Sequence, residues 1–174
     1  MNLKHRWKRS MNYIFLDIDG VMNNQEDWLN KVKEGRREDS MFCDEAWELL
    51  SQVIKETGAR VILSSSWRAG FVQTDSGIDM CDGNCHLTTR LNYYFEEYGI
   101  PIVGLTTSYY DHRGKQIMEY VKQHFSSTDN WIVLDDEDID IKDYVPEERI
   151  IKTEFKTGLL PEHCERIVNY FKGE

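Results

Sequence analysis

The stretch that decides the fold is Tyr13-Ile14-Phe15-Leu16-Asp17-Ile18-Asp19-Gly20. Its first four residues are apolar, which is typical of a short buried strand. Gly20 allows the chain to turn directly afterwards, so both aspartates lie at the carboxyl end of that strand. Ligands of open α/β sheets bind at this edge. An Asp-Gly pair is also a common turn signal, so the stretch predicts a functional site only together with partners elsewhere in the chain.

Later parts of the chain supply such partners. Val61-Ile62-Leu63 is a second apolar run, and it ends in Ser64-Ser65-Ser66-Trp67-Arg68. A third run, Trp131-Ile132-Val133-Leu134, ends in the acidic stretch 135–140. Between them, Arg113-Gly114-Lys115 begins an amphipathic helix. The order along the chain is therefore an acid pair, hydroxyls, a basic residue and a second acid pair.

The apolar pattern predicts strands that alternate with helices. Strands are expected at 13–16, 60–63, 100–104, 131–134 and 149–152. Helices are expected at 44–56, from Thr88 or Thr89 to 98, at 115–125 and from Pro161 onward. Alternation of this kind predicts a parallel sheet with helices on both faces. No clear structure is predicted for 22–42 or 69–85, where we expect a mobile rim around the site.

Length and composition are those of one globular domain. The chain has 174 residues, of which 40% are hydrophobic and 30% charged, enough for a buried core and too apolar for disorder. We expect a single domain over 1–174, with a flexible arm at 1–11. No apolar run approaches the roughly 20 residues that span a bilayer. The basic N-terminus has no apolar segment of a secretory signal, so a cytoplasmic location without membrane partners is predicted.

Net charge and cysteine content exclude further classes of protein. A net charge of −10 excludes a non-specific nucleic-acid coat, although it allows a local basic groove. Cys43 and Cys164 lie in or beside helix patterns and are expected to be buried thiols. Cys81, Cys85 and His86 have the wrong spacing for a zinc knuckle, and no second pair follows. A reduced intracellular loop is the favoured interpretation, with a zinc site as the alternative.

Together, these motifs resemble the four motifs of the haloacid dehalogenase (HAD) superfamily of phosphotransferases. The resemblance extends from about Tyr13 to Phe171. It implies a Rossmann-like fold in which the five predicted strands are ordered 3-2-1-4-5, and this order brings Asp17, Ser64 and Asp136 together. The segment 22–42 lies where this superfamily inserts a cap, and it is long enough only for a small flap or one short helix.

The resemblance also implies roles for individual residues. Asp17 would be the nucleophile, forming an aspartyl-phosphate, and Asp19 would be the general acid and base. Ser64 would bind a phosphoryl oxygen together with the backbone N–H of the next residue, Ser65. Which of the three serines has this role depends on register, and Ser64 follows the apolar run most directly.

The basic residues would stabilise the phosphate. Lys115 matches the lysine of the third motif, and Arg113, two residues earlier, is the alternative. Arg68 departs from the usual pattern and is either a clamp on the substrate or a surface ion-pair residue.

The acidic residues predict a metal cofactor. Asp17, Asp135 and Asp136, with Asp19 nearby, carry four negative charges before a phosphate arrives. A hard divalent cation with oxygen ligands would offset them, so Mg²⁺ is expected. The resemblance implies that the second carboxylate ligand comes from the motif after the fourth strand, which makes it Asp136, with Asp135 or Asp140 as a further direct or water-mediated ligand.

Within the superfamily, the Asp-Ile-Asp-Gly-Val and Ser-Ser-Ser-Trp-Arg segments resemble HAD domains of RNA-repair proteins. They resemble more distantly the phosphatase half of polynucleotide kinase-phosphatases. This implies removal of a terminal 3′-phosphate from RNA or DNA. Because the segment after the first strand is too short to enclose the site, we expect an open approach, lined by Arg68, Lys31, Lys33, Arg36 and Arg37. No GxxxxGK[ST] pattern occurs, so a kinase or ligase activity would come from a separate partner chain. Two alternatives are a phosphatase for nucleotides or other small phosphate esters and an inactive binding module.

Overall fold

A computed structural model describes residues 10–36, 41–81, 86–108 and 111–173 of the chain. Its main sheet contains β1 (Asn12–Leu16), β2 (Arg60–Leu63), β5 (Ile102–Leu105), β6 (Asn130–Asp135) and β7 (Ile150–Lys152). All neighbouring strands in it are parallel, in the order β5-β2-β1-β6-β7. This is the order 3-2-1-4-5 of the five predicted strands. The structure thus confirms the expected Rossmann-like α/β fold.

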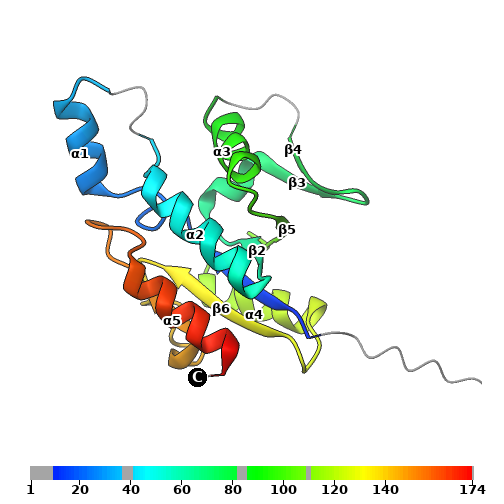
Figure 1. Cartoon of the computed structure of the whole chain (residues 1–174). Coiled ribbons are helices and arrows are strands. Elements are labelled where there is room, and N and C mark those ends of the chain that lie inside the picture. Colours follow the sequence, from blue (N-terminus) through cyan, green and yellow to red (C-terminus); the bar gives the residue numbers. More distant parts are fainter. Residues whose placement is uncertain (1–9, 37–40, 82–85, 109–110, 174) are drawn as a thin grey trace, which may run out of the picture.

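Helices cover both faces of this sheet (Figure 1). The long helices are α2 (Asp44–Thr57), α3 (His86–Glu97), α4 (Arg113–His124) and α5 (Pro161–Lys172). A shorter helix, α1 (Gln25–Lys33), and two 3-10 turns, η2 (Ser66–Gly70) and η3 (Glu147–Arg149), lie in the connections. Apolar residues of α2, α3 and α5 pack on one face, and those of α4 pack on the other.

The central strand β1 is apolar throughout because both of its faces are buried. Ile14 and Leu16 belong to the core under α2 and α5, and both are fully buried. Phe15 points to the opposite face, where its ring meets the ring of Trp131 edge to face at 5.7 Å between centroids. Asp17, which continues the strand, therefore leaves the sheet on the side of α4.

Strand register places the functional motifs at one level of the sheet. Leu16 pairs with Leu63 of β2 and with Leu134 of β6. The backbone N–H of Asp17 donates to the carbonyl oxygen of Leu134 at 3.0 Å, and that of Ser64 donates to Leu16 at 2.9 Å. The residues that follow the three strands consequently meet at the carboxyl edge.

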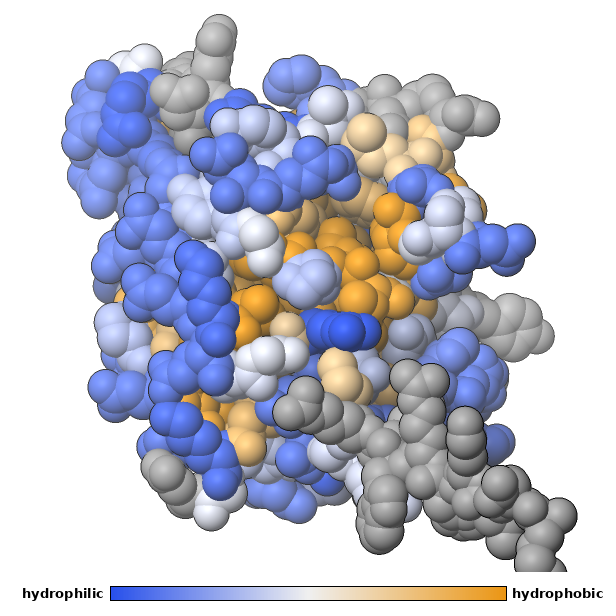
Figure 2. Space-filling model, turned by 45° about the vertical axis from the view of Figure 1, so that its right-hand side comes forward, coloured by the Kyte–Doolittle hydropathy of each residue, from blue (hydrophilic) through white to orange (hydrophobic). Residues whose placement is uncertain are grey.

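The segment 69–85 differs from the expectation of an unstructured rim. It contains an antiparallel hairpin of β3 (Phe71–Thr74) and β4 (Gly77–Met80). Figure 2 brings this side of the molecule forward and shows apolar side chains gathered in its middle. A groove here is lined by apolar residues of α3, β4 and β5, among them Ile78, Phe95 and Ile102.

The segment after the first strand contains α1, the single short helix that its length allows. Lys31 anchors it: its side chain is buried, and Nζ lies 3.0 Å from Asp27 Oδ2 and donates to the carbonyl oxygen of Phe42 at 2.6 Å. Trp28 is 49% exposed. The division into one domain with a small cap stays a prediction.

Other expectations of local structure have mixed outcomes. Residues 1–9 of the predicted arm lie outside the described residues, whereas Met11 N donates to Asp129 Oδ1 at 3.1 Å. Thr88 and Thr89, expected to cap a helix, lie inside α3. Among the described residues, no helix is both long enough and apolar enough to cross a membrane.

Candidate active site

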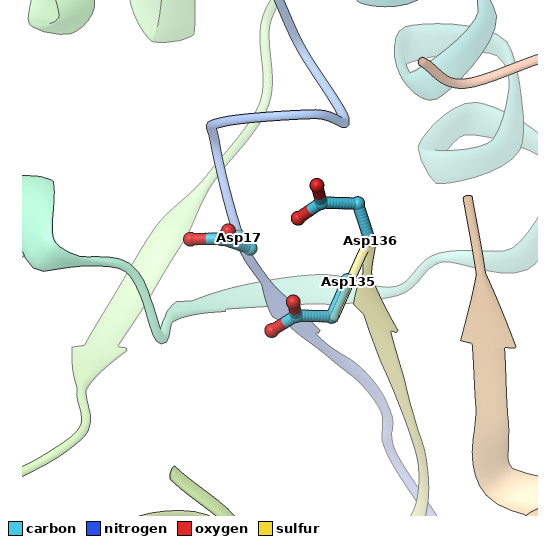
Figure 3. Close-up of side chains that lie close together, drawn as sticks. All are labelled: Asp17, Asp135 and Asp136. Atoms are coloured by element: carbon cyan, nitrogen blue, oxygen red, sulfur yellow. The ribbon is translucent and has the colours of Figure 1, made fainter. Parts of the chain in front are cut away.

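Three carboxylates meet at the ends of β1 and β6 (Figure 3). Oxygen atoms of Asp17, Asp135 and Asp136 all lie within 4.8 Å of one another. Asp17 is 5% exposed and Asp135 is 1% exposed, while Asp136 is partly exposed. Three acids this close and this poorly hydrated repel one another, so the group requires positive charge.

Arg113 supplies part of that charge. Its Nη1 lies 3.0 Å from Asp17 Oδ1 and donates a hydrogen bond to Asp135 Oδ2 at 2.6 Å. The residue is the first of α4, and its backbone N–H donates to Asp140 Oδ2 at 2.7 Å. Asp140 therefore caps this helix and does not belong to the carboxylate group. Of the two acids considered as partners of Asp136, the structure brings Asp135 into the group.

Lys115, expected to stabilise the nucleophile and the phosphate, is directed toward Tyr144 in this structure. Its side chain is exposed, and Nζ lies 5.5 Å from the ring centroid of Tyr144. Residues two apart in a helix point about 200° apart, so Arg113 and Lys115 cannot both face the site. The helix starts at Arg113 and not at Lys115, and this start directs the arginine to the carboxylates.

One guanidinium carries a single positive charge, which does not offset three carboxylates. Burial first, and the neighbouring Asp17 second, raise the pKa of Asp135 against the opposing effect of Arg113. Burial and Asp17 also raise the pKa of Asp136. Burial lowers the pKa of Arg113, but Asp17 and Asp135 raise it by more, so its net shift is upward. Negative charge remains in excess at the site.

This donor set fits a hard divalent cation. Carboxylate oxygens are the ligands that such cations prefer. Gly20 makes room for the group: a Cβ atom at this position would lie 2.3 Å from Asp136 Cγ and Oδ2. Its φ of +70° also favours glycine. Asp136 reaches the other carboxylates across this space.

Asp19, expected as a further metal ligand, is not part of the group. Its Oδ2 accepts a hydrogen bond from the indole N–H of Trp67 at 2.9 Å, and its Oδ1 accepts one from Asn23 Nδ2 at 2.8 Å. The amide oxygen of Asn23 accepts in turn from Gly20 N at 3.0 Å. Both carboxylate oxygens are thus held by side chains. Trp67 and Asn23 are site residues that the sequence analysis missed, although Trp67 lies within one of the motifs.

The three serines after β2 have different surroundings. Ser64 is 1% exposed, and its Oγ accepts a hydrogen bond from Thr106 Oγ1 at 3.4 Å. Ser65 is fully buried and caps η2, with its Oγ accepting from Trp67 N at 3.5 Å. Ser66 is the exposed one, and it lines the same pocket as Asp17. The phosphate-binding roles of Ser64 and Ser65 stay predictions.

Arg68 points into the protein beside the site. Nη1 donates to the carbonyl oxygen of Ser65 at 2.6 Å, and Nη2 donates to Gln116 Oε1 at 3.0 Å. Burial and the charge of Arg113 lower its pKa, and Asp17 opposes this shift. The side chain thus links η2 to α4, and its proposed contact with substrate stays a prediction.

The pocket above the carboxylates is strongly acidic. It has a volume of about 520 Å³ and contains the expected site residues Asp17, Asp19, Arg113, Asp135 and Asp136. Its remaining lining residues are Ser66, Glu137, Ile139, Asp140 and Phe155.

Among the described residues, the basic side chains expected along the approach have different surroundings. Lys31 is buried in ion pairs, Arg36 pairs with Glu34, and Lys33 is exposed. Arg37 lies outside the described residues. Cys85 of the alternative zinc cluster lies outside them as well.

Comparison with known proteins identifies a family. The model of the HAD domain in Swiss Army Knife RNA repair proteins matches residues 13–164. This range includes all four motifs and every member of the carboxylate group. Neither a curated protein nor a solved structure matches the chain significantly.

Proposed function

Because the chain belongs to the family of HAD domains in Swiss Army Knife RNA repair proteins, we propose that it is a Mg²⁺-dependent phosphomonoester hydrolase. Its family supports a phosphatase-type activity in general. The proposed substrate is a terminal phosphate on RNA or DNA, and the proposed covalent intermediate is an aspartyl-phosphate.

The observation that carries the proposal is the arrangement around Asp17. This carboxylate is nearly buried at the edge of the sheet, where Arg113 lies 3.0 Å from one of its oxygens. Asp19 lines the same pocket two residues later. The side chains proposed as nucleophile, phosphoryl-binding cation and acid therefore line one space, which supports phosphoryl transfer.

The proposed reaction has two displacements. In the first, an oxygen of Asp17 attacks phosphorus, the bond to the leaving oxygen breaks, and Asp19 gives that oxygen a proton. In the second, water attacks the phosphorus of the aspartyl-phosphate and Asp19 accepts a proton from that water, while the bond between phosphorus and the Asp17 oxygen breaks and inorganic phosphate leaves. Arg113 neutralises charge on Asp17 and on the transferred group in both steps, which is the role expected for Lys115.

Asp17, Asp135 and Asp136 would hold the metal ion. When bound, Mg²⁺ would supply positive charge for the phosphoryl oxygens and offset the repulsion among the three carboxylates.

A second candidate is hydrolysis of a small phosphate ester. It is favoured by the acidic pocket lining and by the loss of Lys31 to buried ion pairs, because both disfavour a long polyanion. Comparing a 3′-phosphorylated oligonucleotide with the matching mononucleotide separates the candidates. A nucleic-acid substrate predicts a higher kcat/KM for the oligonucleotide and a preference that shrinks as salt concentration rises.

Asp17→Asn tests the reaction itself. An amide cannot act as the nucleophile, so this variant should lose turnover of p-nitrophenyl phosphate in Mg²⁺ while keeping the circular dichroism spectrum of the parent. Asp143→Asn, at an exposed aspartate outside the pocket, is the matched control and should retain activity. If Asp17→Asn keeps activity within about tenfold of the parent, the proposed mechanism fails, because loss of a covalent nucleophile has far larger effects. An inactive parent that still binds phosphate esters would indicate a binding module.

A further inference from the structure

Two large apolar side chains stand exposed at the acidic pocket. Phe155 is 56% exposed and Ile139 is 71% exposed, and both line the space that contains Asp17 and Arg113. Isolated exposed apolar residues are common on protein surfaces. Here, however, two of them share the lining of one pocket whose other residues are almost all charged.

The backbone at Phe155 is held in place by hydrogen bonds. Its carbonyl oxygen accepts from the N–H of Gln25 at 3.1 Å, at the start of α1. The turn around it is closed by the N–H of Gly158, which donates to Glu154 O at 2.8 Å. Just before the turn, Thr153 Oγ1 donates to the carbonyl oxygen of Gly20 at 2.8 Å. The exposed ring therefore lies on a fixed support beside the reacting groups.

Ile139 lies on the neighbouring connection, which follows β6. The carbonyl oxygen of Asp138 accepts hydrogen bonds from Ile141 N at 3.1 Å and from Lys142 N at 3.0 Å. Asp138 also pairs with Lys152 of β7 at 2.9 Å. The two apolar side chains thus come from the ends of adjacent strands, and each lies on an ordered turn.

We propose that Phe155 and Ile139 form a subsite for the nucleobase adjoining the phosphate that is removed. The inference deepens the proposed function and rests on it. A second phosphate next to the first would meet Glu137 and Asp140, which line the same pocket. A flat, neutral group avoids this repulsion, and aromatic side chains stack on every base because each base presents a π face.

The first test measures a ratio of two kcat/KM values, one for adenosine 3′-phosphate and one for ribose 3-phosphate, which lacks the base. The parent should prefer the nucleotide. In Phe155→Ala this preference should fall by about tenfold, which lies within the range of stacking on one aromatic ring. Phe155→Trp should preserve it, and Ile139→Ala should reduce it less than Phe155→Ala does. The matched control is Tyr93→Ala, because Tyr93 is 57% exposed but lies outside this pocket.

A second measurement does not depend on turnover. 2-Aminopurine riboside 3′-phosphate loses fluorescence when its base stacks, and it can be titrated into the Asp17→Asn variant. Quenching that disappears in Asp17→Asn/Phe155→Ala supports the subsite. Absence of quenching, or an unchanged preference in a folded Phe155→Ala variant, overturns it. If quenching is absent while the parent hydrolyses p-nitrophenyl phosphate, only the subsite is refuted. If the Asp17→Asn variant is active, the proposed function is refuted.

Discussion

Replacing Gly20 with alanine should disrupt the carboxylate group through a single methyl group. The new Cβ would lie 2.3 Å from Asp136 Cγ and Oδ2 and 2.7 Å from Asp136 Cβ. In addition, the backbone at Gly20 has a φ of +70°, which costs a residue with a Cβ about 1–2 kcal/mol. The methyl and the Asp136 carboxylate cannot occupy their places together, so one must move.

Gly58→Ala separates the two effects. Gly58 has a φ of +64°, and nothing lies within 4 Å of a Cβ built there. The Gly58→Ala variant should therefore be destabilised only by its left-handed backbone conformation, by about 1–2 kcal/mol of unfolding free energy. Gly20→Ala should lose about 1–3 kcal/mol more if Asp136 stays in place, as overpacked sites do. If Asp136 moves away instead, the loss appears in metal affinity.

Urea unfolding with and without Mg²⁺, together with calorimetric titration of Mg²⁺, measures both quantities. Mg²⁺ should stabilise the parent and Gly58→Ala, because a ligand that binds only the folded state raises stability by mass action. If Asp136 moves, Gly20→Ala should gain little stability from Mg²⁺. If Asp136 stays in place, Gly20→Ala should be less stable than Gly58→Ala. If Gly20→Ala equals Gly58→Ala in both stability and Mg²⁺ affinity, the reasoning about Asp136 is wrong.

Three further predictions concern the neighbouring groups. Trp67→Phe removes a hydrogen bond to the Asp19 carboxylate, and such bonds are worth about 1.5–3 kcal/mol. The kcat should fall at least about tenfold for an alkyl phosphate and much less for p-nitrophenyl phosphate, because the leaving group of the latter needs no proton. Equal losses for the two substrates would contradict a positioning role of Trp67. Asp136→Ala should weaken calorimetrically measured Mg²⁺ affinity by more than about tenfold, and full activity of the parent in excess EDTA would refute the metal site. Arg113→Met should lower kcat/KM about a hundredfold, far more than Lys115→Met does. A larger loss in Lys115→Met would instead support the phosphate-stabilising role that the sequence predicts for Lys115.

The sheet was predictable because its strands are buried on both faces. An apolar run such as Val61-Ile62-Leu63 is stable only in the interior of the sheet. The predicted strand 60–63 accordingly coincides with β2. The hairpin β3–β4 was not predicted, since its strands are short and half exposed. A signal was present in Asp75-Ser76-Gly77, whose residue types favour a turn between two strands.

The site was predictable in its residue types and less so in its contacts. Register alone brings Asp17 and Asp135 together, because both follow paired strand residues. The choice between Arg113 and Lys115 depends on where α4 begins, and helix ends are poorly encoded in sequence. The hydrogen bond from Trp67 to Asp19 spans 48 positions of the chain. Only the packing of η2 against the loop after β1 creates it.

The hydrogen bonds that hold α1 in place have a kinetic consequence. The N–H groups of Gln25 and Glu26 donate to the carbonyl oxygens of residues 155 and 156, and the buried ammonium group of Lys31 holds the other end of the helix to Phe42. A helix held at both ends must break these hydrogen bonds to swing over the pocket, so we expect turnover without an opening step of this helix. Adding sucrose to raise the viscosity of the solution should then leave kcat for the fastest substrate unchanged, whereas enzymes gated by a moving lid slow down.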